Sequence, residues 1–152
     1  MERLRAVKAL RYISPDWGQM DYYPEHPPVK YPCALIDIQG ATYTNLGERI
    51  QQGEATVSIR LFDLMLTPSS HPAPQSIKDN AARFRQLMED VNKTLHGKAL
   101  SGTAGKPVRA SMNKVKRADG CYEVEILYRI PFTDATCYPE RVGVTPALKI
   151  SV

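Results

Sequence analysis

The chain has 152 residues, of which 43% are hydrophobic and 24% charged, and its formal net charge is +4. These values predict a single domain over residues 1–152 with a core of its own, and they exclude a disordered chain. No apolar run approaches the roughly 20 residues of a membrane-spanning helix, and the first residues lack the apolar core of a secretory signal. We therefore expect a cytosolic product, whose basic excess is too small to indicate nucleic-acid binding by itself.

The first third of the chain predicts one short helix and two extended segments. Apolar residues recur at helical spacing over residues 2–11, so we expect a short helix there. Residues 17–23 are a candidate strand. A run of prolines then leads to residues 33–39, where inward-facing apolar residues alternate and the centre is apolar on both sides. That pattern is typical of a strand covered on both faces, and the simplest partner is the next strand, in antiparallel orientation.

A strand followed by a long amphipathic helix is the clearest pattern in the sequence. Residues 55–64 alternate in polarity and end apolar, which is typical of an interior strand. Residues 77–96 carry one apolar stripe at spacings of three and four: Ile77, Ala81, Phe84, Met88, Val91 and Leu95. A helix with a single apolar stripe needs a sheet to pack on, so we expect it to cover the inward side of residues 55–64.

A β-hairpin is predicted over residues 108–116 and 121–130, because Asp119 and Gly120 between them form a strong turn pair. Taking that pair as the loop places Lys116 opposite Glu123, Lys114 opposite Glu125 and Val115 opposite Val124. Residues 146–152 alternate in polarity and predict a terminal strand with a free edge. The expected fold is α+β, with an antiparallel or mixed sheet of about five strands, the long helix on one face and a short N-terminal helix.

The sequence offers no catalytic constellation and no metal site. None of the histidines has a partner at ligand spacing, and no nucleophile motif occurs. Asp37 is the most notable carboxylate, but a solvated aspartate on a strand is the simpler interpretation. Cys33, Cys121 and Cys137 lack the close pairing of a zinc site, so we interpret them as buried or half-buried thiols. We expect no enzyme activity, no bound metal and no cofactor.

Basic residues of the hairpin and the segment before it are candidates for contact with DNA. They are Lys98, Lys106, Arg109, Lys114, Lys116 and Arg117. Two of the lysines have predicted acidic partners across the hairpin, and a solvated basic surface explains the others equally well. A small basic nucleic-acid-binding protein therefore stays open as an alternative.

Several stretches resemble a prophage family found among the tail-assembly genes of long-tailed phages. They are Trp17-Gly-Gln, residues 27–38, residues 44–61, and the helix and hairpin that follow. The pattern, a strand with Gln-Gly-x-x-x-Val-x-Ile followed by a helix and an antiparallel hairpin, is similar to that of tail terminator, or tail completion, proteins. These are minor tail proteins, and the resemblance covers most of residues 17–132.

The resemblance implies a small α+β subunit that forms a ring, typically a hexamer, and caps the tail tube at its head-proximal end. Its expected partners are further copies of itself, the tail tube and the head–tail connector, first in the cytoplasm during assembly and then in the virion tail. Gly47 and Ile50, with Leu148 and Ile150 of the terminal strand, are the expected subunit interface. The basic residues named above would then face the lumen through which DNA passes. A head-closure or other neck protein is the near alternative.

Overall fold

The computed structural model describes residues 1–23, 26–64, 75–100, 102 and 104–138, with side chains of the long helix described from residue 79 onward. Its elements in chain order are the 3-10 helix η1 (Glu2–Ala6), β1 (Tyr12–Pro15), α1 (Gln19–Tyr22), β2 (Cys33–Gly47), β3 (Ile50–Leu64), α2 (Gln75–Leu95), β4 (Val108–Val115) and β5 (Cys121–Asp134). The predicted terminal strand, with Leu148 and Ile150, lies outside the described residues.

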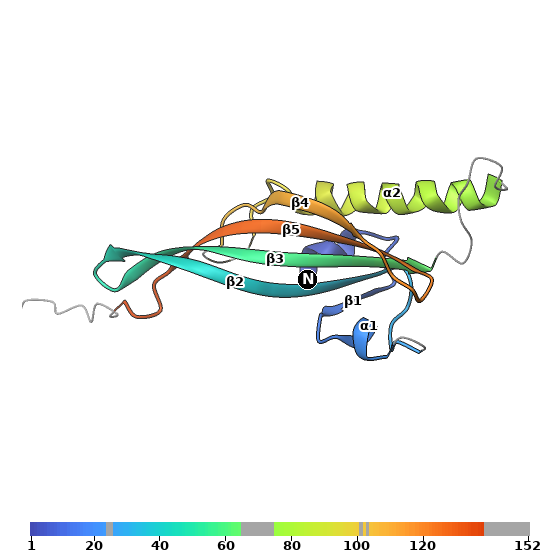
Figure 1. The fold of residues 1–152 in the computed structure, drawn as a ribbon. Helices are drawn as coiled ribbons and strands as arrows, with labels where there is room; N and C mark the ends of the chain where they lie inside the picture. Colours follow the sequence, from blue (N-terminus) through green and yellow to red (C-terminus); the bar gives the residue numbers. More distant parts are fainter. Residues whose placement is uncertain (24–25, 65–74, 101, 103, 139–152) are drawn as a thin grey trace, which may run out of the picture.

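One five-stranded sheet organises the molecule, in the order β1-β2-β3-β5-β4. β1 runs parallel to β2, and the other neighbouring pairs are antiparallel, so the sheet is mixed. α2 lies along one face, and α1 lies at the opposite side of the sheet (Figure 1). The predicted α+β class, the strand number and the antiparallel pairing of β2 with β3 are confirmed.

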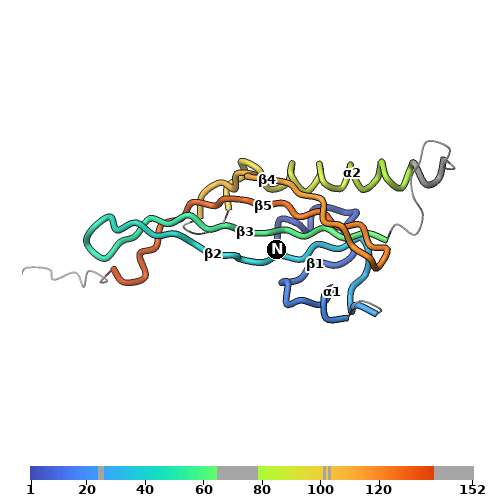
Figure 2. The backbone as a smooth tube through the Cα atoms, viewed as in Figure 1, coloured from blue at the N-terminus to red at the C-terminus, as the bar shows by residue number. Residues whose placement is uncertain are grey.

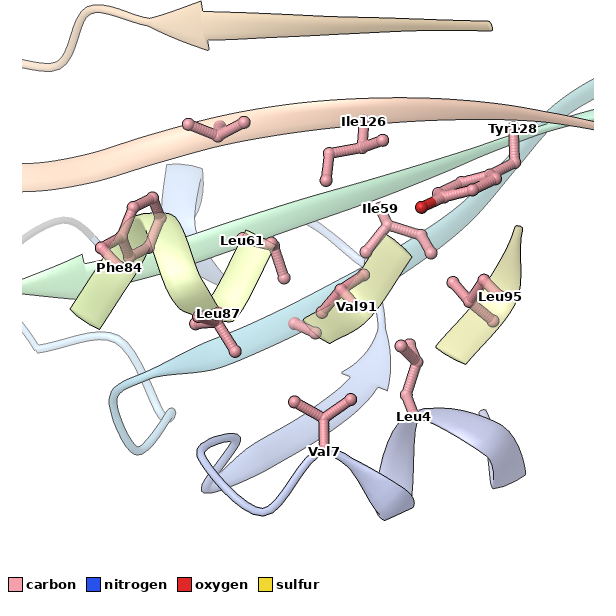
Figure 3. Packing of buried hydrophobic residues seen from close by; sticks show 12 residues of the cluster. Leu4, Val7, Ile59, Leu61, Phe84, Leu87, Val91, Leu95, Ile126 and Tyr128 are labelled. Atoms are coloured by element: carbon pink, nitrogen blue, oxygen red, sulfur yellow. The ribbon is translucent and has the colours of Figure 1, made fainter. Parts of the chain in front are cut away.

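The main core lies between α2 and the sheet, where most of the predicted stripe, joined by Leu87, meets the inward sides of β3 and β5. The side chain of Ile77, also in that stripe, lies outside the described residues. Phe84 and Val91 of α2 are buried against Ile59, Leu61 and Ile126 (Figure 3). The ring of Phe84 meets that of Tyr122 edge to face, with 4.8 Å between centroids. Because the apolar stripe and the alternating strands face each other, the helix is held by burial of apolar surface.

A smaller apolar cluster lies on the other face of the sheet. It consists of Met20 from α1, Cys33 and Leu35 from β2, and Phe62 from β3. Leu35 is fully buried here while its neighbour Ala34 is fully buried in the main core. The prediction that this strand is covered on both faces is therefore confirmed for its first half.

The N-terminal third differs from the prediction. The expected helix over residues 2–11 is the shorter η1, and β1 follows it because Tyr12 can pair with Cys33 of β2. The expected strand over residues 17–23 is the short helix α1. Gly18 supplies the left-handed φ of 88° before that helix, and the fully buried side chain of Gln19 donates a 3.0 Å hydrogen bond to the carbonyl of Pro15.

The predicted hairpin exists, but its register is shifted by one residue. Val115 pairs with Glu123 and Lys114 with Val124, so the expected lysine–glutamate pairs do not form. Asp119 is not a turn residue of a tight loop. Its carboxylate accepts hydrogen bonds from the backbone of Cys121 (3.1 Å) and from Arg117 (2.6 Å), which stabilise a longer loop over residues 116–120. This shift puts the side chains from Ser111 to Val115 on the other face, and a bulge between Arg109 and Ser111 ends the shifted stretch.

Candidate functional site

A buried ionic cluster crosses the sheet face opposite α2. Arg60 of β3 contacts Asp16 at 2.8 Å, Asp21 at 2.9 Å and Glu123 at 2.7 Å. Arg117 contacts Asp21 at 3.0 Å, Glu123 at 2.9 Å and Asp119 at 2.6 Å. Glu123 is 1% exposed and lies between the two guanidinium groups. We call these six residues the ionic cluster.

The ionic cluster joins segments that are distant in the chain. The ring of Phe62 packs against both guanidinium groups, at 5.0 Å from Arg60 and 5.6 Å from Arg117. Arg117 also donates a 2.8 Å hydrogen bond to the backbone carbonyl of Met20 in α1. The cluster thus fastens α1 and the β4–β5 loop to the centre of the sheet, which fits a structural role for these charges.

Two carboxylates of the cluster have lowered pKa values. The hydrogen bond from Arg60 lowers the pKa of Asp21, and that from Arg117 lowers the pKa of Asp119. Burial by itself lowers the pKa of Arg60, but its hydrogen bonds to Asp21, Glu123 and Asp16 outweigh burial and raise it. For Arg117 the hydrogen bond to Asp119 has the largest effect and also raises the pKa. Both arginines therefore stay charged.

We expect the protein to lose stability as the pH falls below about 3.8, the ordinary pKa of an aspartate. Lowered folded-state pKa values contribute stability that is complete above the unfolded pKa and is lost as the pH falls through the folded pKa. Urea unfolding at several pH values from about 5 to about 2.5 would measure how the free energy of unfolding changes with pH. Asp119→Asn should make the slope shallower, and an unchanged slope in that variant would contradict the assignment.

Arg60 is a central residue of the ionic cluster that the sequence interpretation did not single out. It lies between the buried Ile59 and Leu61 in the middle of a strand, where a charge needs buried partners. A charge placed in this way could have been recognised from the sequence as needing partners. Its partners could not have been identified, because Asp21 and Glu123 are 39 and 63 residues from Arg60 in the chain.

The residues predicted to face DNA do not form one surface. Arg117 is engaged in the ionic cluster, and the Lys114 ammonium lies 4.5 Å from the ring centroid of Tyr122. Lys98, Lys106 and Arg109 come closer together, because Gly97 donates a 2.8 Å backbone hydrogen bond to Pro107. A second bond, from the Arg109 N–H to the Nδ1 atom of His96 (3.1 Å), fixes the same junction. Lys116 is exposed in the β4–β5 loop.

A narrow ribbon extends beyond the core, formed by the far halves of β2 and β3 with the end of β5 (Figures 1 and 2). Residues 37–47 of β2 are all exposed. The sequence predicts strands over residues 33–39 and 55–64, but in the structure both strands are longer and continue to a tight turn. Glu48 and Arg49 form this turn with positive φ values of 49° and 66°. We call residues 38–54 and 131–134 the ribbon.

None of the described helices covers the ribbon (Figure 1), and its apolar side chains are exposed to solvent. Ile38 is 70% exposed, Leu46 59% and Tyr43 54%. Its β2 edge carries no charged residue from Ile38 to Gly47, and β1 pairs with β2 only at residues 33–36. Natural sheets usually protect such an edge with charges, prolines or a covering element, so this edge is suited to a partner. The predicted interface residues Gly47 and Ile50 face each other at the ribbon tip.

An aromatic pair stiffens the ribbon over Gly53. Tyr43 and Phe132 pair with Gly53 from its two sides, and their rings meet edge to face with centroids 5.4 Å apart. A Cβ atom at Gly53 would lie 2.3 Å from the Phe132 ring. The glycine is therefore required by the close approach of the ring.

We expect Gly53→Ala to displace the Phe132 ring and loosen the ribbon, with a loss in unfolding free energy of about 1 kcal/mol. Hydrogen exchange of the amides of residues 50–54 should accelerate. Gly40→Ala is the matched control, because a Cβ there meets nothing within 4 Å in the same ribbon. Equal acceleration in both variants would show that the aromatic pair does not stiffen the ribbon.

A second exposed aromatic group surrounds α1. Trp17 is 51% exposed, Tyr22 76% and Tyr23 53%, and the rings of Trp17 and Tyr23 meet edge to face at 6.0 Å. Exposed aromatic side chains of this size are typical of contact surfaces. The ribbon and the α1 aromatics are thus two exposed apolar surfaces that suit contact with other proteins.

The described residues contain no group of histidine, cysteine, aspartate or glutamate side chains that could hold a metal ion. Cys33 is buried, Cys121 half-buried and Cys137 exposed, and all are free thiols. Burial raises the pKa of Cys33 to about 12, so this thiol is not poised as a nucleophile. Asp37 is exposed, in agreement with its interpretation as a solvated strand residue.

In the described part of the chain, no helix has the length and apolar character needed to cross a membrane. No family model matches the sequence, and no curated protein matches it. Among solved structures the fold is similar to a chain of the "Virion of native gene transfer agent (GTA) particle". The TM-score is 0.51 at 11% sequence identity, and the alignment covers 88% of this chain and 90% of that chain. At this identity the likeness concerns the fold.

Proposed function

We propose that this protein is a structural subunit of a phage-like particle, and more specifically a tail terminator that oligomerises at the head-proximal end of the tail tube. The ribbon carries this proposal. It is a projection with exposed apolar side chains and an uncharged β2 edge, and within the described residues the main core does not extend into it. Such a projection is useful when it contacts another subunit.

The fold similarity supports the coarser part of the proposal. A neighbour of the same fold, over most of both chains, comes from a virion particle. The sequence pattern that resembles tail completion proteins spans β2, β3, α2 and the hairpin, which are the elements that build the sheet and its helix. A head-closure or other neck protein stays the near alternative.

A nucleic-acid-binding function has weaker support. Two of its six candidate residues, Lys114 and Arg117, are engaged with Tyr122 and with the ionic cluster. Lys98, Lys106 and Arg109 remain exposed near one another, and they would serve a lumen-facing surface in a ring. Contact with DNA phosphates would show as binding that falls steeply with salt.

Electron microscopy of the protein mixed with its tail tube tests the proposal. We expect one ring of copies at the head-proximal end, because a heterologous contact closes only with the correct rotation. Copies along the tube or at its distal tip would contradict a terminator. A ring found only on the connector would favour the neck alternative.

A single substitution in the ribbon adds a sharper expectation. Leu46→Glu should abolish assembly at the tail end while leaving the stability of the free subunit unchanged, because Leu46 is 59% exposed. Leu46→Met, which keeps an apolar side chain, is the matched control and should assemble normally. Normal assembly of the glutamate variant would exclude the ribbon tip from the contact.

A further inference from the structure

A cavity of about 380 Å³ opens where the start of α2 meets the end of β3 and the segment after η1. Three cationic residues line it: Lys8, Arg11 and Arg83. Its apolar lining includes Phe84 and Leu87, which are 3% and 2% exposed. We propose that this cavity binds a carboxylate group presented by a partner protein. The inference does not depend on a role in a phage-like particle.

The cations have few competing partners within the described residues. The side chains of Lys8 and Arg11 make no hydrogen bond or ion pair with that part of the chain, and Arg83 donates one 2.8 Å hydrogen bond to Asn80. A guanidinium group has several more donors in a planar fork that matches the two oxygens of a carboxylate. Within the described residues, the site thus offers donors without a partner beside an apolar lining.

One carboxylate of the protein shares the cavity with these cations. Asp63 lies at the end of β3, and one of its oxygens accepts a 2.9 Å hydrogen bond from the backbone of Leu64. Burial raises the pKa of Asp63, while the charges of Arg83 and Arg11 act to lower it. Both arginines are therefore close enough to act on a carboxylate at this position. A second carboxylate would meet the same two groups.

A peptide carboxylate fits the cavity better than a nucleic-acid backbone. Binding to a nucleic-acid backbone usually requires several cations in a row, whereas the three cations here line one cavity. Here Asp63 stands among the cations, and the buried rings and methyl groups beside it suit the apolar side chain that adjoins a carboxylate. The carboxylate can come from a chain terminus or from an acidic side chain, which the experiment separates.

The test is an NMR titration of the full chain, following the backbone amides of Asp63, Arg83 and Leu87. The probes are N-acetyl-phenylalanine for a chain terminus, N-acetyl-glutamic acid α-amide for an acidic side chain, and N-acetyl-phenylalaninamide as the uncharged control. We expect saturable shifts with at least one acid and none with the amide. The acid that binds more tightly identifies the source.

Matched variants locate the binding in this cavity. Arg83→Gln should weaken the affinity for the acid by about ten-fold, the usual effect of losing one charge-assisted contact. Arg85→Gln, an exposed neighbour on α2 that does not line the cavity, should bind as the parent does. Asp63→Asn should bind the acid more tightly, because it removes the competing carboxylate.

Three results would overturn the inference. The first is the absence of shifts with both acids, and the second is an equal response to the amide. The third is a single-stranded oligonucleotide that perturbs these amides when neither acid does, which would assign the cavity to phosphate groups instead. None of these results bears on the ring proposal, since the cavity and the ribbon share no residue.

Discussion

Replacing Glu123 with alanine is expected to lower the free energy of unfolding by about 3 kcal/mol. The side chain of Glu123 is 2% exposed and contacts both Arg60 and Arg117, so its removal leaves two half-buried guanidinium groups with fewer partners. The remaining acids of the ionic cluster keep the loss from being larger. Urea or guanidinium unfolding with linear extrapolation measures it.

Glu125→Ala is the matched control for this prediction. Glu125 lies two residues along the same strand and has neutral partners, with hydrogen bonds from Ser58 (2.8 Å) and Gln39 (3.1 Å). We expect it to cost about 1 kcal/mol, as for an ordinary hydrogen bond. Equal losses in unfolding free energy at the two positions would mean that the position of Glu123 between the arginines adds no stability beyond that of an ordinary hydrogen bond.

Truncation of Phe84 to alanine is expected to cost about 3 to 5 kcal/mol. Phe84 is 3% exposed, packs on Tyr122 and anchors the first half of α2 on the sheet. Its loss removes buried apolar surface and leaves a cavity between helix and sheet. Thermal and chemical unfolding should both show the lower stability. Hydrogen exchange of residues 43–53 in the ribbon should change little.

Arg85→Ala controls for the helix itself. Arg85 is exposed on the same turn of α2, so its replacement should change the unfolding free energy by less than about 0.5 kcal/mol. If Phe84→Ala were equally mild, the helix would not be held by this stripe. The core of Figure 3 would then need a different anchor.

The two predictions test opposite faces of one sheet. α2 covers the first face with apolar contacts, and the ionic cluster fastens α1 and a loop to the second. Beyond both of them the ribbon continues without cover (Figure 2). The main core and the ionic cluster are thus concentrated at one end of the sheet, and the ribbon carries exposed apolar side chains at the other.

The sequence by itself determined the elements whose signals are local. Strand β3 and helix α2 follow from alternation and from the three–four spacing, because periodicity decides which side chains share a face before any partner is present. The α+β class, the burial of Phe84 and Val91 and the antiparallel partner of β2 follow from these patterns. The exposure of Asp37 also agreed with the interpretation from sequence.

Tertiary structure alone decided what depends on distant partners. β1 forms because β2 offers it an edge, and residues 19–22 become a helix whose place is set by contacts with Arg60 and Arg117. Distant partners also set the hairpin register, since Glu123 contacts Arg60 and Arg117 and not a lysine across the turn. Charges separated by tens of residues leave no periodic trace in the chain, and their pairing is settled only when the sheet brings them together.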